Sequence, residues 1–124
     1  MRLHVQRFWC PKRGSSAAEY EDATAVSTGN GTIRRLAVAD GASESTFARL
    51  WATLLVDAYA GGTLSPETLT DQLWPLQQRW SAEVATKPLL WYASEKARSG
   101  AFAALAGLTV CRSGTWRALA AGDS

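Results

Sequence analysis

The sequence has few of the residues that form the commonest metal and nucleophile motifs. It contains two cysteines, Cys10 and Cys111, which are not in a metal-binding spacing, and one histidine, His4. We expect both thiols to be reduced and packed, because a disulfide would need an oxidising compartment. No serine or cysteine nucleophile motif is present. The sequence therefore excludes the usual zinc-ligand and covalent-nucleophile patterns.

Long apolar runs are also absent. No stretch approaches the roughly 20 apolar residues that a membrane-spanning helix needs. The first residues, Met1-Arg2-Leu3-His4, lack the apolar core of a signal peptide. Internal repeats, low-complexity tracts and linkers are absent as well. These absences predict a cytoplasmic protein with no membrane partner.

The excess of positive charge is small. The chain has 13 Lys and Arg against 11 Asp and Glu, which gives a net charge of +2. Nucleic-acid-binding domains usually gather their basic residues in a patch, whereas here these residues are scattered. The length of 124 residues and the hydrophobic content of 47% suit one domain with a buried core. We expect a single domain over residues 1–124 and no nucleic-acid partner.

Hydrophobic alternation and turn residues predict several strands. Loose alternation begins the chain, and two further runs flank an Asn-Gly dipeptide. Two more runs near the end flank Ser113-Gly114. The predicted strands cover residues 3–9, 22–28, 33–39, 108–112 and 115–121.

Helical spacing of apolar residues fills the interval between these strands. The first predicted helix, over residues 44–59, has Ser43 as its N-cap and ends at Gly61-Gly62. The second opens at Ser65 and continues to residue 85, with a break at Pro75, and a third covers residues 89–98. We expect their tryptophans to form an aromatic cluster, which comprises Trp74, Trp80 and Trp91.

The dipeptide Asn30-Gly31 is a strong signal for a tight hairpin. A two-residue turn there would set Asp22 opposite Ala39 and Glu21 opposite Asp40. A register shifted by one residue would instead pair Asp22 with Asp40. Directly opposed side chains have Cβ atoms about 4.5–5.5 Å apart. Carboxylates that close repel each other unless a cation lies between them.

Acidic residues follow or precede three of the predicted strands. Asp40-Gly41 comes at the end of an apolar strand, where a carboxylate beside bare backbone suits a hard metal ion. The pair Glu21-Asp22 precedes another strand, and Asp123 follows the last one. This arrangement predicts a divalent-metal site. Because the sequence ends at Ser124, one residue after Asp123, we expect the site to be incomplete.

In this order, the motifs resemble the N-terminal half of the metal-dependent protein phosphatases, the PPM or type-2C family. The resemblance covers nearly the whole chain. It is carried by Glu21-Asp22-Ala23, by residues 36–42, by the helix that begins at Glu44, and by residues 101–104 and 116–124. The stretch Ala42-Ser43-Glu44-Ser45 is similar to the bacterial branch, which implies a role in bacterial signalling.

The resemblance implies a fold and an activity. Members of the family have an α/β (α+β) fold in which a β-sandwich is flanked by helices in α-β-β-α layers. They are hydrolases that remove phosphate from phosphoserine and phosphothreonine in proteins. They use two Mn²⁺ or Mg²⁺ ions, with a third in some members, to activate a water molecule. A phosphoprotein would therefore be the substrate.

The resemblance also implies roles for individual residues. Asp40 would bridge both metals, and the backbone carbonyl of Gly41 would bind one of them. Glu21 and Asp22 would serve catalysis by orienting metal-bound water. Asp123 matches an aspartate that helps to bind the third metal.

Two positions depart from the family pattern. Ala42 stands where many members have a histidine that protonates the leaving oxygen. Many members also have a phosphate-binding arginine shortly before the acidic pair. The nearest basic residues here, Lys12 and Arg13, lie further away, and ordinary loop charges explain them equally well.

The later metal-binding aspartates and strands of the family lie beyond position 124. We therefore expect a truncated PPM-type domain, with its C-terminal part missing, that is inactive alone. We also expect it to self-associate through the exposed edge of its sheet. Whether the chain is an enzyme stays open at this point. The alternative is a non-catalytic pseudophosphatase or phosphoprotein-binding regulatory module.

Overall fold

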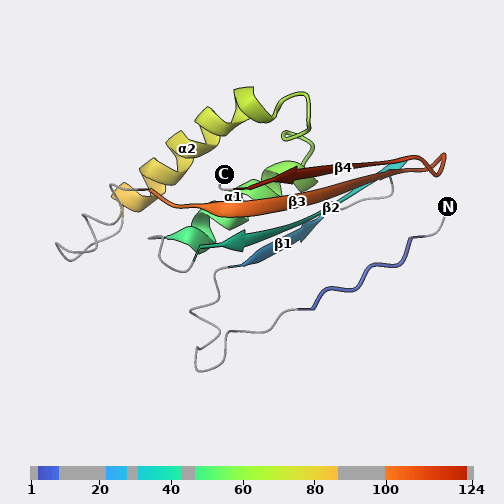
Figure 1. Cartoon of the computed structure of the whole chain (residues 1–124), viewed down its shortest axis with the longest axis horizontal. Helices are drawn as coiled ribbons and strands as arrows, with labels where there is room; N and C mark the ends of the chain where they lie inside the picture. Colours follow the sequence, from blue (N-terminus) through green and yellow to red (C-terminus); the bar gives the residue numbers. More distant parts are fainter. Residues whose placement is uncertain (1–2, 9–21, 28–30, 43–46, 87–99, 123–124) are drawn as a thin grey trace.

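The computed structural model of the chain describes residues 3–8, 22–27, 31–42, 47–86 and 100–122. These residues form a mixed α/β arrangement of strands and helices (Figure 1). The elements are β1 (Ala23–Val26), β2 (Ile33–Gly41), α1 (Ala48–Ala60), α2 (Leu69–Ala85), β3 (Ala103–Cys111) and β4 (Trp116–Ala121). The expectation of a mixed α/β fold is therefore confirmed. None of the described helices is long and apolar enough to cross a membrane.

The four strands form one antiparallel sheet in the order β1-β2-β3-β4. Ala25 pairs with Ala37, Ala37 with Gly107, and Gly107 with Leu119. Each register joins odd-numbered residues to odd-numbered ones and even to even. Because successive side chains of a strand point to opposite faces, the odd-numbered residues share one face and the even-numbered residues share the other.

The odd-numbered face packs against α1 and forms the core. Its alanines and leucines are buried, as are the residues of α1 that face them. The sheet contributes Ala37, Ala39, Ala103, Leu105 and Leu119, and α1 contributes Trp51, Leu54, Leu55 and Tyr59. The helical spacing of aromatic and leucine residues in the sequence is thus a core pattern. Both helices lie on this side of the sheet (Figure 1).

A close contact between α1 and β3 fixes the helix over the sheet. Gly107 lies directly beneath the ring of Tyr59, and a Cβ at this position would be 2.5 Å from Tyr59 Cζ. The Tyr59 hydroxyl forms a hydrogen bond of 2.8 Å with Thr109 Oγ1 on the same strand. The missing side chain at Gly107 therefore makes room for a ring whose polar end is satisfied by Thr109.

Helix α1 begins later than its sequence pattern predicts. The N-cap is Phe47, which has φ 56° and ψ 35°, and the helix starts at Ala48. This left-handed backbone at Phe47 cannot continue a helix from residue 44, so the prediction of Ser43 as the N-cap is wrong. Trp80 Nε1 donates a hydrogen bond of 3.2 Å to the Phe47 carbonyl oxygen, which ties α2 to this turn. The predicted end is confirmed, because Gly61 caps α1.

Helix α2 continues through Pro75. The predicted break is absent because Leu76, Trp80 and Val84 are buried on one face and hold the second half of the helix in line with the first. Trp74 is 65% exposed, so the expected cluster of Trp74 with Trp80 is not formed. The predicted helix over residues 89–98 lies outside the described residues, as does Trp91.

The hairpin of β3 and β4 agrees with the sequence pattern. Cys111 donates its backbone N–H to the Thr115 carbonyl oxygen at 2.8 Å, closing the turn around Ser113-Gly114. Strand β3 begins at Ala103, five residues before its predicted start. The Cys111 thiol is free and half-buried, whereas Cys10 lies outside the described residues.

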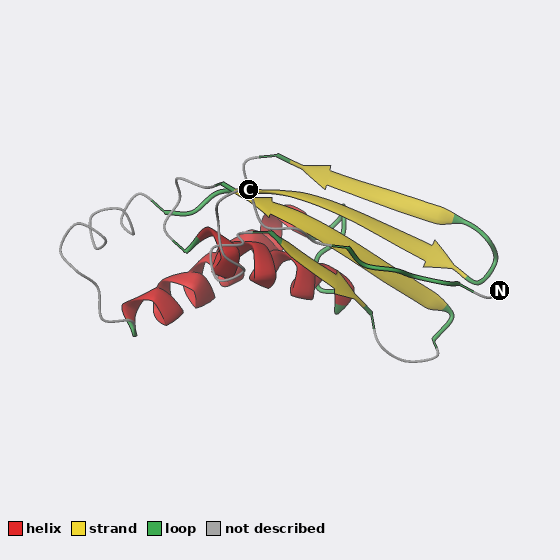
Figure 2. Cartoon of the chain, turned by 90° about the horizontal axis from the view of Figure 1, so that it is seen from below, coloured by secondary structure: helices red, strands yellow, loops and turns green. Residues whose placement is uncertain are grey.

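Residues 3–8 form no strand, contrary to the prediction. They run in an extended path along the even-numbered face of the sheet, opposite the helices (Figures 1 and 2). Val5 is half-buried, whereas the other five residues are exposed, and Phe8 is exposed to 82%. The loose alternation of this stretch thus gives too few buried side chains to hold it in a sheet.

We expect Gly107→Ala to destabilise the fold. The new methyl group would overlap the Tyr59 ring, and overpacking of this kind costs about 1–3 kcal/mol. Urea unfolding followed by tryptophan fluorescence measures the change. Gly31→Ala is the control, because the nearest atom to its Cβ would be 3.8 Å away. Equal stability of the two variants would contradict the close packing of Tyr59 on Gly107.

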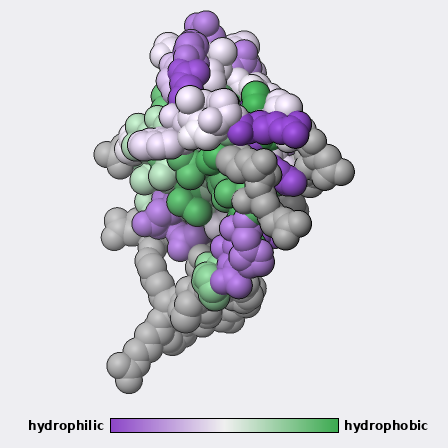
Figure 3. Space-filling model, turned by 90° about the vertical axis from the view of Figure 1, so that its right-hand side faces the viewer, coloured by the Kyte–Doolittle hydropathy of each residue, from purple (hydrophilic) through white to green (hydrophobic). Residues whose placement is uncertain are grey.

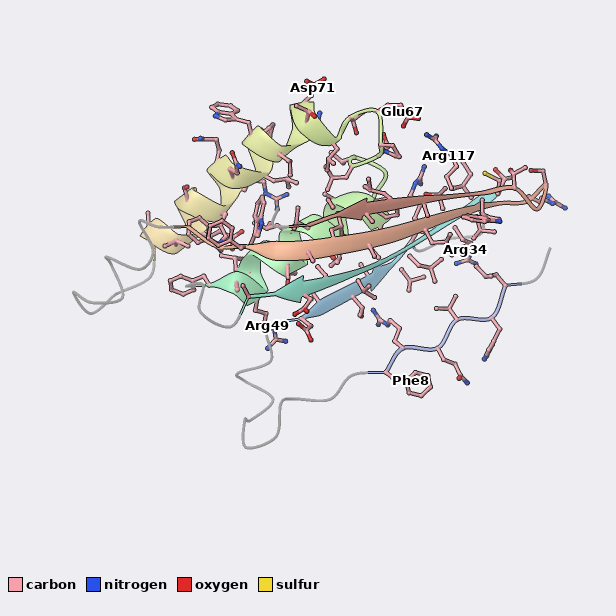
Figure 4. The ribbon with its side chains drawn as sticks, in the orientation of Figure 1. Phe8, Arg34, Arg49, Glu67, Asp71 and Arg117 are labelled. Atoms are coloured by element: carbon pink, nitrogen blue, oxygen red, sulfur yellow. The ribbon has the colours of Figure 1, made fainter. Side chains whose placement is uncertain are left out.

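We expect Glu67→Gln to weaken the acid dependence of stability. Arg117 on β4 donates a hydrogen bond to the Glu67 carboxylate (Figure 4), and this lowers the pKa of Glu67. Because the pKa of Glu67 is lower in the folded state, its ionised form stabilises the fold at pH values above the pKa of the unfolded state. This stabilisation is lost as the pH falls through the pKa of the folded state. Melting temperatures between pH 3 and 7 would therefore fall less in the variant. Because both side chains are about 60% exposed, 1 M NaCl should abolish the difference.

Candidate metal-binding site

The pairing of β1 with β2 decides which acidic residues meet. Ala23 lies opposite Ala39, and Ser27 donates its backbone N–H to the Arg35 carbonyl oxygen at 2.8 Å. The register that a two-residue turn would give, with Asp22 opposite Ala39, is therefore wrong by one residue. The shifted register, which the sequence left as the second choice, is the one formed.

Hydrogen bonds of Ser27 explain why the connection is longer than a two-residue turn. The Ser27 hydroxyl accepts a hydrogen bond of 2.9 Å from the Arg35 backbone N–H. The Ser27 carbonyl oxygen accepts another, at 3.4 Å, from Arg34 Nη1. These bonds fix the end of β1 against β2 and satisfy polar groups that a tighter hairpin would place differently.

Extending this register by one residue sets Asp22 opposite Asp40. In an antiparallel ladder, hydrogen-bonded and non-hydrogen-bonded pairs alternate. Ser27 and Arg35 are a hydrogen-bonded pair of odd-numbered residues, so the even-numbered pairs of β1 and β2 have no backbone hydrogen bonds between them. In such pairs the Cα atoms are only about 4.5 Å apart and the side chains approach closely. Both aspartates also belong to the even-numbered face. The ladder therefore brings two carboxylates together at one end of the sheet.

The surroundings of this pair are open to solvent on one side. Asp40 is exposed and Asp22 is half-buried, whereas Gly41, the last residue of β2, is buried and pairs with Ala103. Beyond it, Ala42 donates its backbone N–H to the Phe102 carbonyl oxygen at 3.0 Å. Within the described part of the chain, the Asp40 carboxylate has no ion-pair partner. Its oxygens are thus available to a ligand.

The other predicted site residues cannot be placed. Glu21, Lys12, Arg13 and Asp123 lie outside the described residues. Strand β4 ends at Ala121, which belongs to the same cross-strand row as Ala39. The strand that precedes Asp123 in the sequence therefore ends at the same end of the sheet as Asp40.

Arg49 is a charged residue near this site that the sequence pattern did not indicate. It lies in the first turn of α1 and is exposed. Figure 4 shows it projecting from the helix beside the start of β1, the strand that Asp22 precedes. The helix predicted from the sequence began at residue 44, which put Arg49 in its second turn, where it looked like an ordinary surface residue. In this view its side chain lies toward the end of the sheet where β1 starts.

The chemistry of two neighbouring carboxylates can be compared with what hard divalent cations need. Mg²⁺ is commonly held by one or two carboxylates and keeps several waters, and Mn²⁺ accepts the same oxygen ligands. Among the residues that the structure describes, no group of three or more His, Cys, Asp or Glu side chains is placed to hold a metal ion. The described residues alone therefore do not complete a two-metal centre.

The comparisons with known proteins add no identification. Neither a family model, nor a curated protein, nor a solved structure matches this chain. The candidate site consequently rests on the strand register and on the chemistry of its side chains.

We expect Asp22→Cys with Asp40→Cys to form a disulfide under mild oxidation. The background would carry Cys10→Ser and Cys111→Ser, so that the new pair is the only one. Non-hydrogen-bonded cross-strand pairs have the short Cβ separation that a disulfide needs. Mass spectrometry with and without reductant measures its formation. The control, Asp22→Cys with Ala39→Cys, places the thiols on opposite faces, and faster oxidation of that control would refute the register.

Proposed function

We propose that this chain is the metal-binding part of a PPM-type protein phosphatase, which hydrolyses phosphoserine and phosphothreonine. The observation that supports the proposal best is the position of Asp22 opposite Asp40. The two acidic motifs that the family resemblance assigns to the metal centre are distant in the sequence and meet at one end of the sheet. The proposal includes the second sheet of the family's sandwich, which would pack on the even-numbered face.

Each residue of the site would have a specific task. Asp40 would bind the metal through its exposed carboxylate, and Gly41 would contribute its backbone carbonyl. Asp22 would orient metal-bound water, as would Glu21. When bound, Mn²⁺ or Mg²⁺ would activate that water and neutralise charge on the phosphoryl group. Arg49 would bind the phosphate oxygens of the substrate, because a guanidinium forms charge-assisted hydrogen bonds with them.

One observation favours a second candidate, a non-catalytic module that binds metal or phosphoprotein without hydrolysis. The described residues supply two carboxylates at the site, and no larger ligand group is found among them. A single ion held by Asp22 and Asp40 lacks the metal pair on which the family's chemistry depends. Binding without turnover would distinguish this candidate from the phosphatase.

We expect Asp40→Asn to weaken Mn²⁺ binding at least about tenfold, because the metal loses a charged ligand. Isothermal titration calorimetry at low ionic strength measures the affinity. Asp71→Asn is the matched control, since Asp71 is an exposed aspartate on α2, far from β1 in Figure 4. If both variants bind Mn²⁺ as the unchanged chain does, Asp40 is not a metal ligand.

We expect the full reading frame that contains this chain to hydrolyse a phosphothreonine peptide only when Mn²⁺ or Mg²⁺ is present. Asp40→Asn should reduce kcat by two orders of magnitude or more, and EDTA should abolish turnover. Arg49→Gln should mainly raise KM, because it removes a phosphate contact and leaves the metal ligands in place. Undiminished activity in Asp40→Asn would reject the phosphatase. Mn²⁺ binding without any turnover would support the non-catalytic module.

A further inference from the structure

The face of the sheet opposite the helices is apolar and largely uncovered. Its side chains are the even-numbered ones, and several large members are exposed: Val38 is 53% exposed, Trp116 67% and Leu108 37%. Charged residues on this face of β2 stand only near its two ends. An antiparallel sheet with one face in water normally carries polar side chains there. The composition therefore indicates a face that another layer covers.

Residues 3–8 do not close this face. They run across it as an extended segment (Figure 2), and one hydrogen bond, of 3.5 Å from Arg7 Nη1 to Thr24 Oγ1, joins them to β1. A cavity of about 330 Å³ remains between the segment and the sheet, lined by Val5, Val26, Leu36, Val38 and Leu108. Seen from the right-hand side of Figure 1, the molecule shows hydrophobic surface in its middle, with hydrophilic residues above and below it (Figure 3).

The order of side chains along β2 is self-complementary. On the uncovered face the strand reads Arg34, Leu36, Val38, Asp40, so a cation and an anion flank two apolar residues. The end residues are about 20 Å apart, at roughly 3.3 Å per residue. A second copy of the strand, reversed by a two-fold rotation, sets Arg34 over Asp40 at both ends. The same rotation places Leu36 over Val38 in the middle.

The two-fold axis of this rotation lies midway between the two sheets, perpendicular to the strands, and passes over Ala37 of β2. It also passes over Gly107 on β3 and Leu119 on β4, because these residues pair in one row with Ala37. The axis then relates large residues of one copy to small residues of the other. The facing pairs are Leu108 with Ala106, Val110 with Ala104, and Trp116 with Gly122.

The last of these pairs has room to form. A Cβ placed on Gly122 would meet no atom within 4 Å, and the Trp116 side chain is exposed. Charge and side-chain size are thus complementary under a single rotation. Stacked sheets pack about 10 Å apart with their strands nearly aligned, which is the geometry that this rotation gives.

We infer that the uncovered face binds a second copy of this chain and forms a two-fold symmetric dimer. The second copy displaces residues 3–8 from the sheet, and Arg34 of each copy pairs with Asp40 of the other. This pairing occupies the carboxylate that the proposed function gives to the metal, so the dimer and the metal-bound chain exclude each other. The dimer does not depend on that function. It occupies the face that the proposed second sheet would cover, so this chain forms it and a chain that carries that sheet does not. It also differs from edge-to-edge association, which would lengthen the sheet through β1 or β4 and leave this face uncovered.

The test is sedimentation equilibrium of the full chain over a range of concentrations in EDTA, so that no metal is bound. The expected species is a closed dimer of twice 13.3 kDa. Trp116→Ala should raise its dissociation constant at least about tenfold, since it empties a large interface contact. Trp74→Ala, which removes an equally exposed tryptophan from α2, should leave the constant unchanged.

Charge exchange tests the two-fold pairing. Arg34→Glu alone and Asp40→Arg alone should each weaken the dimer at least about tenfold, because each places like charges together at both ends of β2. The double variant restores opposite charges and should recover the dimer. Circular dichroism melting of all variants separates misfolding from dissociation. A monomer at all concentrations, a series of larger assemblies, or a double variant as weak as the singles would overturn the inference.

Discussion

The register of the four antiparallel strands determines where every side chain of the sheet lies. Because opposed residues always share parity, the buried alanines and leucines gather on one face, and Arg34, Val38 and Asp40 gather on the other. A slip of one residue between β1 and β2 would move Asp22 to the face away from Asp40. The hydrogen bonds of Ser27 thus hold the arrangement on which the candidate site depends.

Small residues let the helix approach the sheet closely enough to form a core. Alanines line the covered face of β2, and Gly107 on β3 leaves space for the Tyr59 ring. On the opposite face, β3 and β4 carry small residues toward one end, including Ala104, Ala106 and Ala120, and large ones toward the other, including Val110 and Trp116. One face of the sheet is thus covered by α1, and the other face is suited to packing against a further layer.

The core pattern could be read from the sequence, whereas the local start of the helix could not. Spacing of Trp51, Leu54 and Leu55 predicted α1 because periodicity reflects burial. Its first residue depends on the left-handed turn at Phe47 and on the bond from Trp80, and both are tertiary features. Likewise, Asn30-Gly31 predicted a hairpin but gave the wrong register, because hydrogen bonds of the Ser27 side chain and backbone decide its length. Arg49 became a candidate only once the start of the helix was known.

We propose that carboxylates from two distant stretches create a site for a divalent cation at the end of the sheet. Paramagnetic broadening of backbone amide signals by substoichiometric Mn²⁺ tests it most directly, since the effect reports distance from the ion. We expect the signals nearest Asp22 and Asp40 to broaden first and those of α2 to persist. Uniform broadening, or broadening centred elsewhere in the chain, would contradict it.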